Sequence, residues 1–186
     1  MCSTAQVSNA LLDTAMVLVV MGVSGCGKST VASSLANALG WTFIEGDAFH
    51  PPENVQRMAQ GIALSDTDRV LWLDRLAKEL AHQSSQGTGV VLACSALKKS
   101  YRDVLRRGCP DAFFVHLDGP AELIRQRLSE RKGHYMPSSL LQSQYATLEP
   151  PVQPELAWRY EVTLAPQAIV DDLLRRLSKG LATPRV

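Results

Sequence analysis

Val17-Leu-Val-Val-Met21 and the stretch Gly22-Val-Ser-Gly-Cys-Gly-Lys28-Ser29 that follows it decide the fold of this chain. Five apolar residues without a break are typical of a strand buried on both faces of a parallel sheet. From Ser29 to Leu39 the apolar residues recur at helical spacing, and Gly40 can cap the end of that helix. The stretch therefore predicts a central strand, a glycine-rich loop and a helix.

The glycine-rich loop fits the pattern G-x-x-x-x-G-K-[ST] of a P-loop, and it lies between a predicted strand and a predicted helix, as that motif requires. Glycines let the backbone N–H groups point at phosphate oxygens, and the helix N-terminus adds partial positive charge. Lys28 is expected to reach the β- and γ-phosphates of ATP, and the Ser29 hydroxyl to bind Mg²⁺. The expected nucleotide-binding residues of the loop are Gly22, Val23, Ser24, Gly25, Cys26, Gly27, Lys28, Ser29 and Thr30. A glycine-rich turn that only packs a strand on a helix is the alternative.

Strand and helix patterns alternate along the rest of the chain. Further strands are expected at residues 41–44, 90–94, 112–117 and 160–164. Helices are expected from Pro51, after a Ser65–Asp68 cap, and at residues 97–107, 120–131, 138–148 and 166–177. The alternation predicts an α/β protein with a five-stranded parallel sheet and helices on both faces.

Length and composition indicate one globular domain. The 186 residues are 46% hydrophobic and 20% charged, with a net charge of +1 that offers no basic field for nucleic acid or an anionic membrane. The four cysteines are scattered, which excludes a zinc cluster or a disulfide framework and favours the cytoplasm. We expect a flexible N-terminus at residues 1–15, a domain at 16–186, and a lid over about 127–155.

Other P-loop classes fit the sequence poorly. A GTPase would need an Asn-Lys-x-Asp segment, which is absent, and large AAA-type ATPases normally end the next core strand in an acidic residue. Here Val90–Cys94 is followed by Ser95, so the carboxylate must come from elsewhere. Asp47, at the end of the second predicted strand, should face the crevice beyond the carboxyl ends of the strands. It is a candidate general base, an indirect Mg²⁺ ligand, or both.

Three further segments resemble the gluconokinases of the small P-loop type. They are Gly46-Asp-Ala-Phe-His-Pro51, Cys94-Ser-Ala-Leu-Lys-Lys-Ser-Tyr-Arg-Asp103 and Arg127-Leu-Ser-Glu-Arg-Lys-Gly-His134. With the P-loop, the resemblance spans residues 16–150, and the first two segments are specific to that family. It implies a three-layer P-loop kinase fold like that of adenylate and shikimate kinases, with the strand order 2-3-1-4-5 and a mobile lid. It also implies ATP-dependent phosphorylation of D-gluconate at its 6-hydroxyl. It also implies a cytoplasmic homodimer.

An acidic polyol needs a cation for its carboxylate and hydrogen-bonding groups for its hydroxyls. Arginine can bind a carboxylate through two parallel hydrogen bonds, so we expect Arg57 or Arg102 to bind it and His50 to contact a hydroxyl. Lys98 starts the helix after the third strand and is a further substrate-binding candidate. The alternative for the basic residues of that helix is an ordinary solvated face.

Arg127 and Arg131 lie four residues apart and therefore share one face of a helix that leads into a polar segment. An arginine on a closing lid can neutralise the transferred phosphoryl group and exclude water. The resemblance places Arg127 near the nucleotide, Arg131 on the lid as a catalytic residue, and His134 and Gln144 near the substrate. Two alternatives remain open: a kinase of another small acceptor, such as shikimate or a nucleoside monophosphate, and a regulatory module with slow ATPase activity.

Overall fold

A computed structural model describes residues 16–130 and 140–179. Its strands form one parallel sheet in the order β2-β3-β1-β4-β5, as the sequence predicted. The strands are β1 (Val17–Met21), β2 (Thr42–Glu45), β3 (Val90–Ala93), β4 (Phe113–Asp118) and β5 (Ala157–Glu161).

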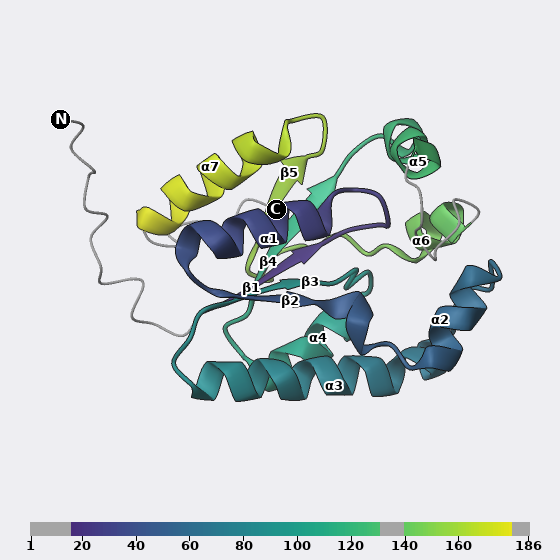
Figure 1. The fold of residues 1–186 in the computed structure, drawn as a ribbon, viewed down its shortest axis with the longest axis horizontal. Helices are drawn as coiled ribbons and strands as arrows, with labels where there is room; N and C mark the ends of the chain where they lie inside the picture. The colour runs from purple at the N-terminus through teal and green to yellow at the C-terminus, as the bar shows by residue number, and fades with distance from the viewer. Residues whose placement is uncertain (1–15, 131–139, 180–186) are drawn as a thin grey trace.

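Helices cover both faces of the sheet. They are α1 (Lys28–Leu39), the short 3-10 helix η2 (Gly46–Phe49), α2 (Pro52–Ala59), α3 (Asp66–Ser85), α4 (Lys99–Gly108), α5 (Ala121–Glu130), α6 (Leu141–Thr147) and α7 (Pro166–Ser178). Figure 1 shows α1 and α7 on one face and α3 and α4 on the other, so the predicted three-layer architecture is confirmed. None of the helices within the described ranges is long and apolar enough to cross a membrane.

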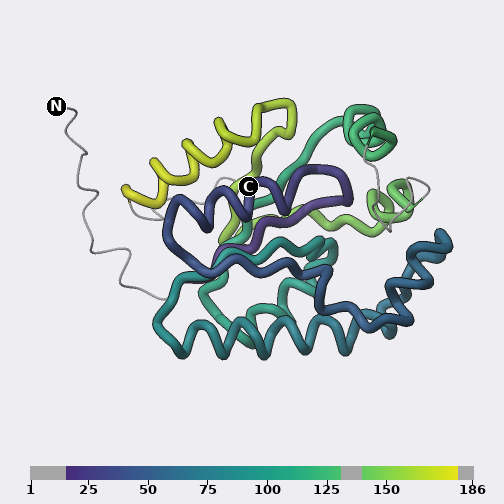
Figure 2. The backbone as a smooth tube through the Cα atoms, viewed as in Figure 1, coloured from purple at the N-terminus to yellow at the C-terminus, as the bar shows by residue number. Residues whose placement is uncertain are grey.

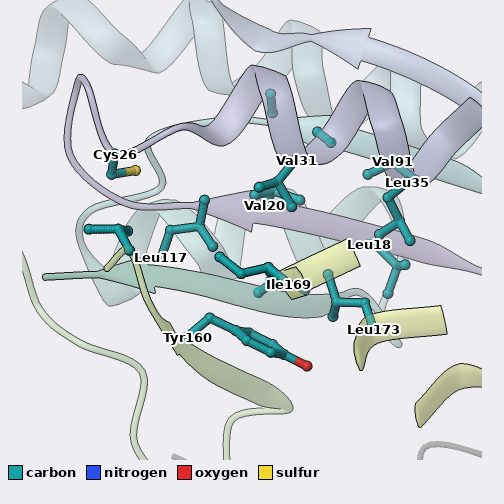
Figure 3. Close-up of a cluster of buried hydrophobic side chains, with 14 of the residues drawn as sticks. Leu18, Val20, Cys26, Val31, Leu35, Val91, Leu117, Tyr160, Ile169 and Leu173 are labelled. Atoms are coloured by element: carbon teal, nitrogen blue, oxygen red, sulfur yellow. The ribbon is translucent and has the colours of Figure 1, made fainter. Parts of the chain in front are cut away.

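The position of β1 at the centre of the sheet, with a core on each face, explains why its sequence has no polar residue. Leu18 and Val20 point into the core beneath α1 and α7, where Figure 3 shows them with Val31, Leu35 and Leu173. The alternate residues of β1 point into a second core beneath α3 and α4. All five residues are buried, because successive side chains of a strand point to opposite faces of the sheet.

Two helix ends follow the expected chemistry. Gly40 has a φ of 67° and closes α1 with its N–H bonded to the carbonyls of Ala36 and Asn37. Ser65 and Asp68 form a reciprocal capping box at the start of α3, in which each side chain accepts the other residue's backbone N–H. The capping motif therefore fixes where the longest helix of the described chain begins.

The fifth strand starts earlier than expected. The sequence predicted residues 160–164, but β5 is Ala157–Glu161, paired with β4 from Phe114 to Asp118. The backbone N–H of Leu164 donates to the carbonyl of Glu161, which turns the chain away from the sheet. In the same way α4 begins at residue 99 rather than 97. The described part of the helix expected at 138–148 is α6, and residues 138–139 lie outside the described ranges.

Three loops meet at the carboxyl ends of the strands. The P-loop joins β1 to α1, η2 follows β2, and the backbone N–H of Gly22 donates to the carbonyl of Ser95 after β3, at 3.3 Å. Figure 2 shows that the chain reaches the carboxyl ends of the strands from several elements that are far apart in sequence. Ligand sites of open α/β sheets lie beyond these ends.

Candidate active site

The P-loop has a backbone shape that glycine makes possible. Gly22, Gly25 and Gly27 have φ values of 137°, 83° and 99°, which side-chain-bearing residues rarely adopt. A Cβ atom on Gly22 would lie 2.5 Å from the carbonyl oxygen of Leu117, and one on Gly25 would lie 2.6 Å from Leu128. The glycines of the motif therefore allow both the turn itself and its close packing on neighbouring elements.

Lys28 starts α1, and its ammonium donates a hydrogen bond to the carbonyl of Val23 within the same loop, at 3.0 Å. This bond holds the lysine over the loop, where phosphate oxygens can compete for it. Cys26 is buried in the loop, and burial raises the pKa of its thiol. The thiol therefore stays protonated and acts as a packing group.

A crevice of about 500 Å³ opens above the P-loop. Its walls bring together residues from four parts of the chain: Ser24, Gly25, Gly27, Lys28, Ser29, Thr30, Asp47, Arg127, Glu130 and Pro166. Asp47 comes from η2 and Arg127 from α5, so the structure places both beside the P-loop, as expected. Arg127 also donates to the backbone carbonyl of Val162 at 2.8 Å, which ties α5 to the connection after β5.

The oxygen atoms of this crevice suit Mg²⁺. Ser29 offers a hydroxyl and Asp47 a carboxylate, and both are hard donors of the kind that the ion prefers. The described ranges contain no cluster of three or more His, Cys, Asp or Glu residues that could hold a metal ion alone. Mg²⁺ in kinases is usually held by one or two protein oxygens together with substrate phosphates, so this donor set fits it.

Trp72 of α3 holds the turn that carries Asp47 and His50. Its indole N–H donates to the carbonyl of Gly46 at 2.8 Å, and its ring stacks on His50 with centroids 4.1 Å apart. Burial lowers the pKa of His50 to about 4, against a smaller opposing effect of Asp47, so its imidazole is neutral at pH 7. From sequence alone, Trp72 is interpreted as a packing residue of this helix that could help to shape the acceptor pocket.

Two predicted substrate-binding cations have carboxylate partners in the first turn of α3. Arg57 pairs with Asp68 at 2.7 Å, and Lys98 pairs with Asp66 at 2.7 Å. The hydroxyl of Tyr101 also donates to Asp66, at 2.5 Å. Substrate binding by Arg57 and Lys98 stays a prediction, and a substrate carboxylate would have to compete with these aspartates.

The prediction that Arg102 binds the substrate carboxylate is wrong. The side chain is only 1% exposed, and its Nε and Nη2 atoms each donate to Glu155 at 2.7 Å. Its Nη1 donates to the carbonyls of Ala96 and Glu149. The guanidinium is thus fully used inside the protein, where it holds the loop after β3 against the Pro-rich segment after α6.

The remaining predicted residues fall in or near the expected lid. Arg131 and His134 lie outside the described residues. Gln144, on α6, is buried against the P-loop, where its Oε1 accepts the backbone N–H of Ser24 at 2.6 Å. This contact was not expected, because nothing in the sequence links two positions that are 120 residues apart.

Fold and site together resemble a known class of enzyme. A family model described as an AAA domain matches residues 17–151. A crystal structure of an APS kinase from Mycobacterium tuberculosis has the same fold, with a TM-score of 0.68 and 19% identity over 90% of this chain and 99% of that one. The P-loop, the sheet order and the crevice define a P-loop kinase.

The relatives at higher identity are more specific. A gluconokinase from Gluconobacter oxydans is 49% identical over 158 residues, which cover 85% of this chain and 89% of that protein. The crystal structure of a gluconokinase from Sinorhizobium meliloti has a TM-score of 0.79 and 45% identity, covering 89% of this chain and 93% of that one. The chain belongs to the gluconokinase family, and it is a nucleotide-binding phosphotransferase.

Proposed function

We propose that the protein transfers the γ-phosphoryl group of MgATP to the 6-hydroxyl of D-gluconate, giving 6-phosphogluconate and ADP. The observation that carries the proposal is the crevice in which Lys28, Ser29 and Asp47 come together. The relatives are gluconokinases, which indicates gluconate as the acceptor, and the arrangement of the crevice residues supports phosphoryl transfer from ATP.

Lys28, Ser29 and Asp47 have distinct tasks in this reaction. Lys28 would exchange the carbonyl of Val23 for the β- and γ-phosphate oxygens, and Ser29, with Asp47 as an indirect ligand, would hold Mg²⁺. When bound, the ion neutralises charge on the phosphates. As the acceptor oxygen bonds to the γ-phosphorus, the bond to the bridging oxygen of ADP breaks, and the hydroxyl proton passes to the Asp47 carboxylate.

Arginines on the α5 side support the same charge. Arg127 lines the crevice with the P-loop residues and can contact the nucleotide. For Arg131 and His134, outside the described residues, we propose contacts to the transferred phosphoryl group and the substrate, as the family resemblance implies. A guanidinium at the transferred phosphoryl group stabilises the charge that spreads over its oxygens.

We place the acceptor next to Asp47, on the side of the crevice where η2 lies. A neutral His50 can both donate to and accept from sugar hydroxyls, which suits a polyol. Arg57 and Lys98 add positive charge, and each can bind the substrate after exchanging its aspartate partner.

We also propose a cytoplasmic homodimer that acts in gluconate metabolism. Light scattering after size exclusion tests the dimer.

A coupled ADP-release assay tests the function. MgATP is offered with D-gluconate, shikimate, AMP or glycerate, and with no acceptor. Stimulation by D-gluconate alone supports the proposal. Stimulation by AMP or shikimate instead would make the protein a kinase of another acceptor, and slow turnover indifferent to all four would favour a regulatory ATPase module.

A further inference from the structure

The proposed substrate carries a carboxylate, and the cations expected to bind it already have acidic partners. Arg102 is buried against Glu155, while Arg57 and Lys98 pair with the aspartates of α3. An incoming carboxylate gains little at a cation that must first give up a carboxylate of the protein. The substrate carboxylate should therefore bind a cation on this side of the crevice that lacks a carboxylate partner.

Arg69 of α3 is such a cation. No carboxylate of the described residues lies within ion-pair distance of it. Its Nη1 donates to the carbonyl of Leu64 at 2.5 Å and to the hydroxyl of Tyr101 at 3.4 Å, and both partners are neutral. Asp66 lies near enough for Arg69 to lower its pKa slightly, but its oxygens are taken by Lys98 and Tyr101. The partly buried guanidinium thus keeps an unmatched charge.

The position of Arg69 on α3 directs it toward the acceptor side. Arg69 precedes Trp72 by three residues, so the two share one face of the helix. Trp72 stacks on His50 and holds Gly46, which places this face against η2. The charge of Arg69 also contributes to the lowered pKa of His50, as expected for a guanidinium close to that ring. Tyr101, 5.6 Å below the guanidinium, bounds the position on the α4 side.

The free edge of the guanidinium has the right geometry for a carboxylate. Within the described ranges, only Nη1 of Arg69 has hydrogen-bond partners, so Nε and Nη2 are open. Arg102 uses the same two atoms to grip both oxygens of Glu155, each at 2.7 Å. This paired arrangement is the strongest that an arginine forms with a carboxylate.

We propose that Arg69 binds the substrate carboxylate through its Nε and Nη2 atoms and thereby selects sugar acids over neutral polyols. The inference rests on the proposed function, since it specifies how that acceptor is recognised. Arg57 and Lys98, which pair with Asp68 and Asp66, then contact hydroxyls of the substrate rather than its carboxylate.

The test removes the charge from the enzyme and from the substrate in turn. The kcat/KM is measured for D-gluconate and for D-gluconamide, which keeps the hydroxyls but is uncharged, in the wild type and in Arg69→Met. The wild type should prefer gluconate by about 10- to 100-fold, the scale of a hydrogen-bonded charge. In Arg69→Met the ratio should approach one, mainly through a higher KM for gluconate, and Arg69→Lys should restore part of the preference.

Three comparisons make the result decisive. Arg75→Met, on an exposed turn of the same helix, should keep the wild-type ratio. Nucleotide affinity of Arg69→Met should match the wild type, and its unfolding midpoint should fall only by the loss of the bonds to Leu64 and Tyr101, with Arg69→Lys unfolding near the same midpoint, which separates recognition from misfolding. A wild-type ratio in Arg69→Met, or its loss in Arg57→Met instead, would overturn this inference alone. A wild type that does not phosphorylate gluconate would refute the proposed function and this inference with it.

Discussion

Lys28 and Asp47 approach the crevice from different walls, one from the start of α1 and the other from η2. The lysine offers a positive charge at the site of the phosphates, and the carboxylate offers a place for a proton or a metal ion. These tasks differ, so replacing each residue should disturb a different step.

Lys28→Ala should lower kcat by roughly 10²- to 10³-fold, equivalent to about 3–4 kcal/mol, which is the scale of losing one preorganised donor to a developing charge. The ADP-release assay at saturating substrates measures it. Lys78→Ala removes an exposed lysine that pairs with Asp74 on α3 and should leave kcat unchanged. A loss of less than about tenfold in Lys28→Ala would refute the role given to this lysine.

Asp47→Asn keeps the size of the side chain but removes its basicity and its charge. We expect nucleotide binding to persist, while phosphoryl transfer slows by about 10²- to 10⁴-fold, the usual contribution of a general base. Calorimetry with a non-hydrolysable ATP analogue and single-turnover kinetics separate the two steps. Glu53→Gln, on the nearby α2, is the matched control, and undiminished transfer in Asp47→Asn would make Asp47 a structural residue.

Among the site residues, the sequence predicted those whose position follows from the local backbone structure. The P-loop residues and Asp47 lie where strands end, and parallel topology brings such positions together. Arg102 was mispredicted because its partner Glu155 is 53 residues away, and no local pattern tells into which layer a helical arginine points. Arg69 was not predicted, because the role proposed for it depends on the absence of a carboxylate partner among the described residues, which no local pattern shows.

Among the elements, α4 depends on a segment that follows α6. Its own first residues provide no side-chain cap, and the carboxylate of Glu149 accepts the backbone N–H of Lys99 at 2.7 Å. The backbone N–H of Glu149 donates to the carbonyl of Leu97, and Arg102 grips Glu155 a few residues later. The Pro-rich segment is therefore fastened to the loop after β3 at several points.

Arg102→Met should destabilise the protein by about 3–5 kcal/mol, because among the described residues it leaves Arg106 as the only ionic partner of the buried Glu155. Urea unfolding measures the change in the free energy of unfolding. The double variant Arg102→Met with Glu155→Leu should recover much of the loss, since no buried charge is then left unpaired. Arg125→Met, which breaks an exposed pair with Glu122, should cost at most about 1 kcal/mol, and an equal cost for Arg102→Met would contradict this account.

Element boundaries were predictable where capping or glycine chemistry marks them, as at Ser65 and Gly40. β5 was misplaced because its inward residues Trp158 and Tyr160 continue in an apolar alternation to Val162 and Leu164. Alternation shows which residues face the core but not where pairing with β4 stops. That limit is set by tertiary contacts.

For the whole molecule, alternating strands and helices were enough to predict the sheet and its two covered faces. Which side chains fill the two cores, and which polar groups are buried near them, was harder to predict from the sequence. His116, on β4, is a buried polar residue that is 2% exposed, and its Nε2 has no hydrogen-bond partner within the described ranges. Burial lowers the pKa of His116 to about 4.

This lowered pKa predicts how stability depends on pH. Between pH 6.5 and about 4 the unfolded chain binds a proton at His116 that the folded protein does not, so stability is full above pH 6.5 and falls as the pH falls. The contribution approaches about 1.4 kcal/mol per pH unit inside that window. His116→Gln should reduce the slope of the curve measured by urea unfolding, leaving the slope that the lowered pKa of His50 contributes, and His82→Gln, at an exposed position, should leave the slope unchanged. Equal slopes in the wild type and His116→Gln would contradict the prediction.

The product of the reaction tests the central claim most directly. MgATP and D-gluconate are incubated with the protein, and the phosphorus spectrum of the product is recorded by NMR. Transfer to the 6-hydroxyl predicts a phosphoester signal that couples to both protons of the terminal CH₂ group and matches authentic 6-phosphogluconate. A signal coupled to a single proton, as for a secondary hydroxyl, or inorganic phosphate alone, would contradict the account.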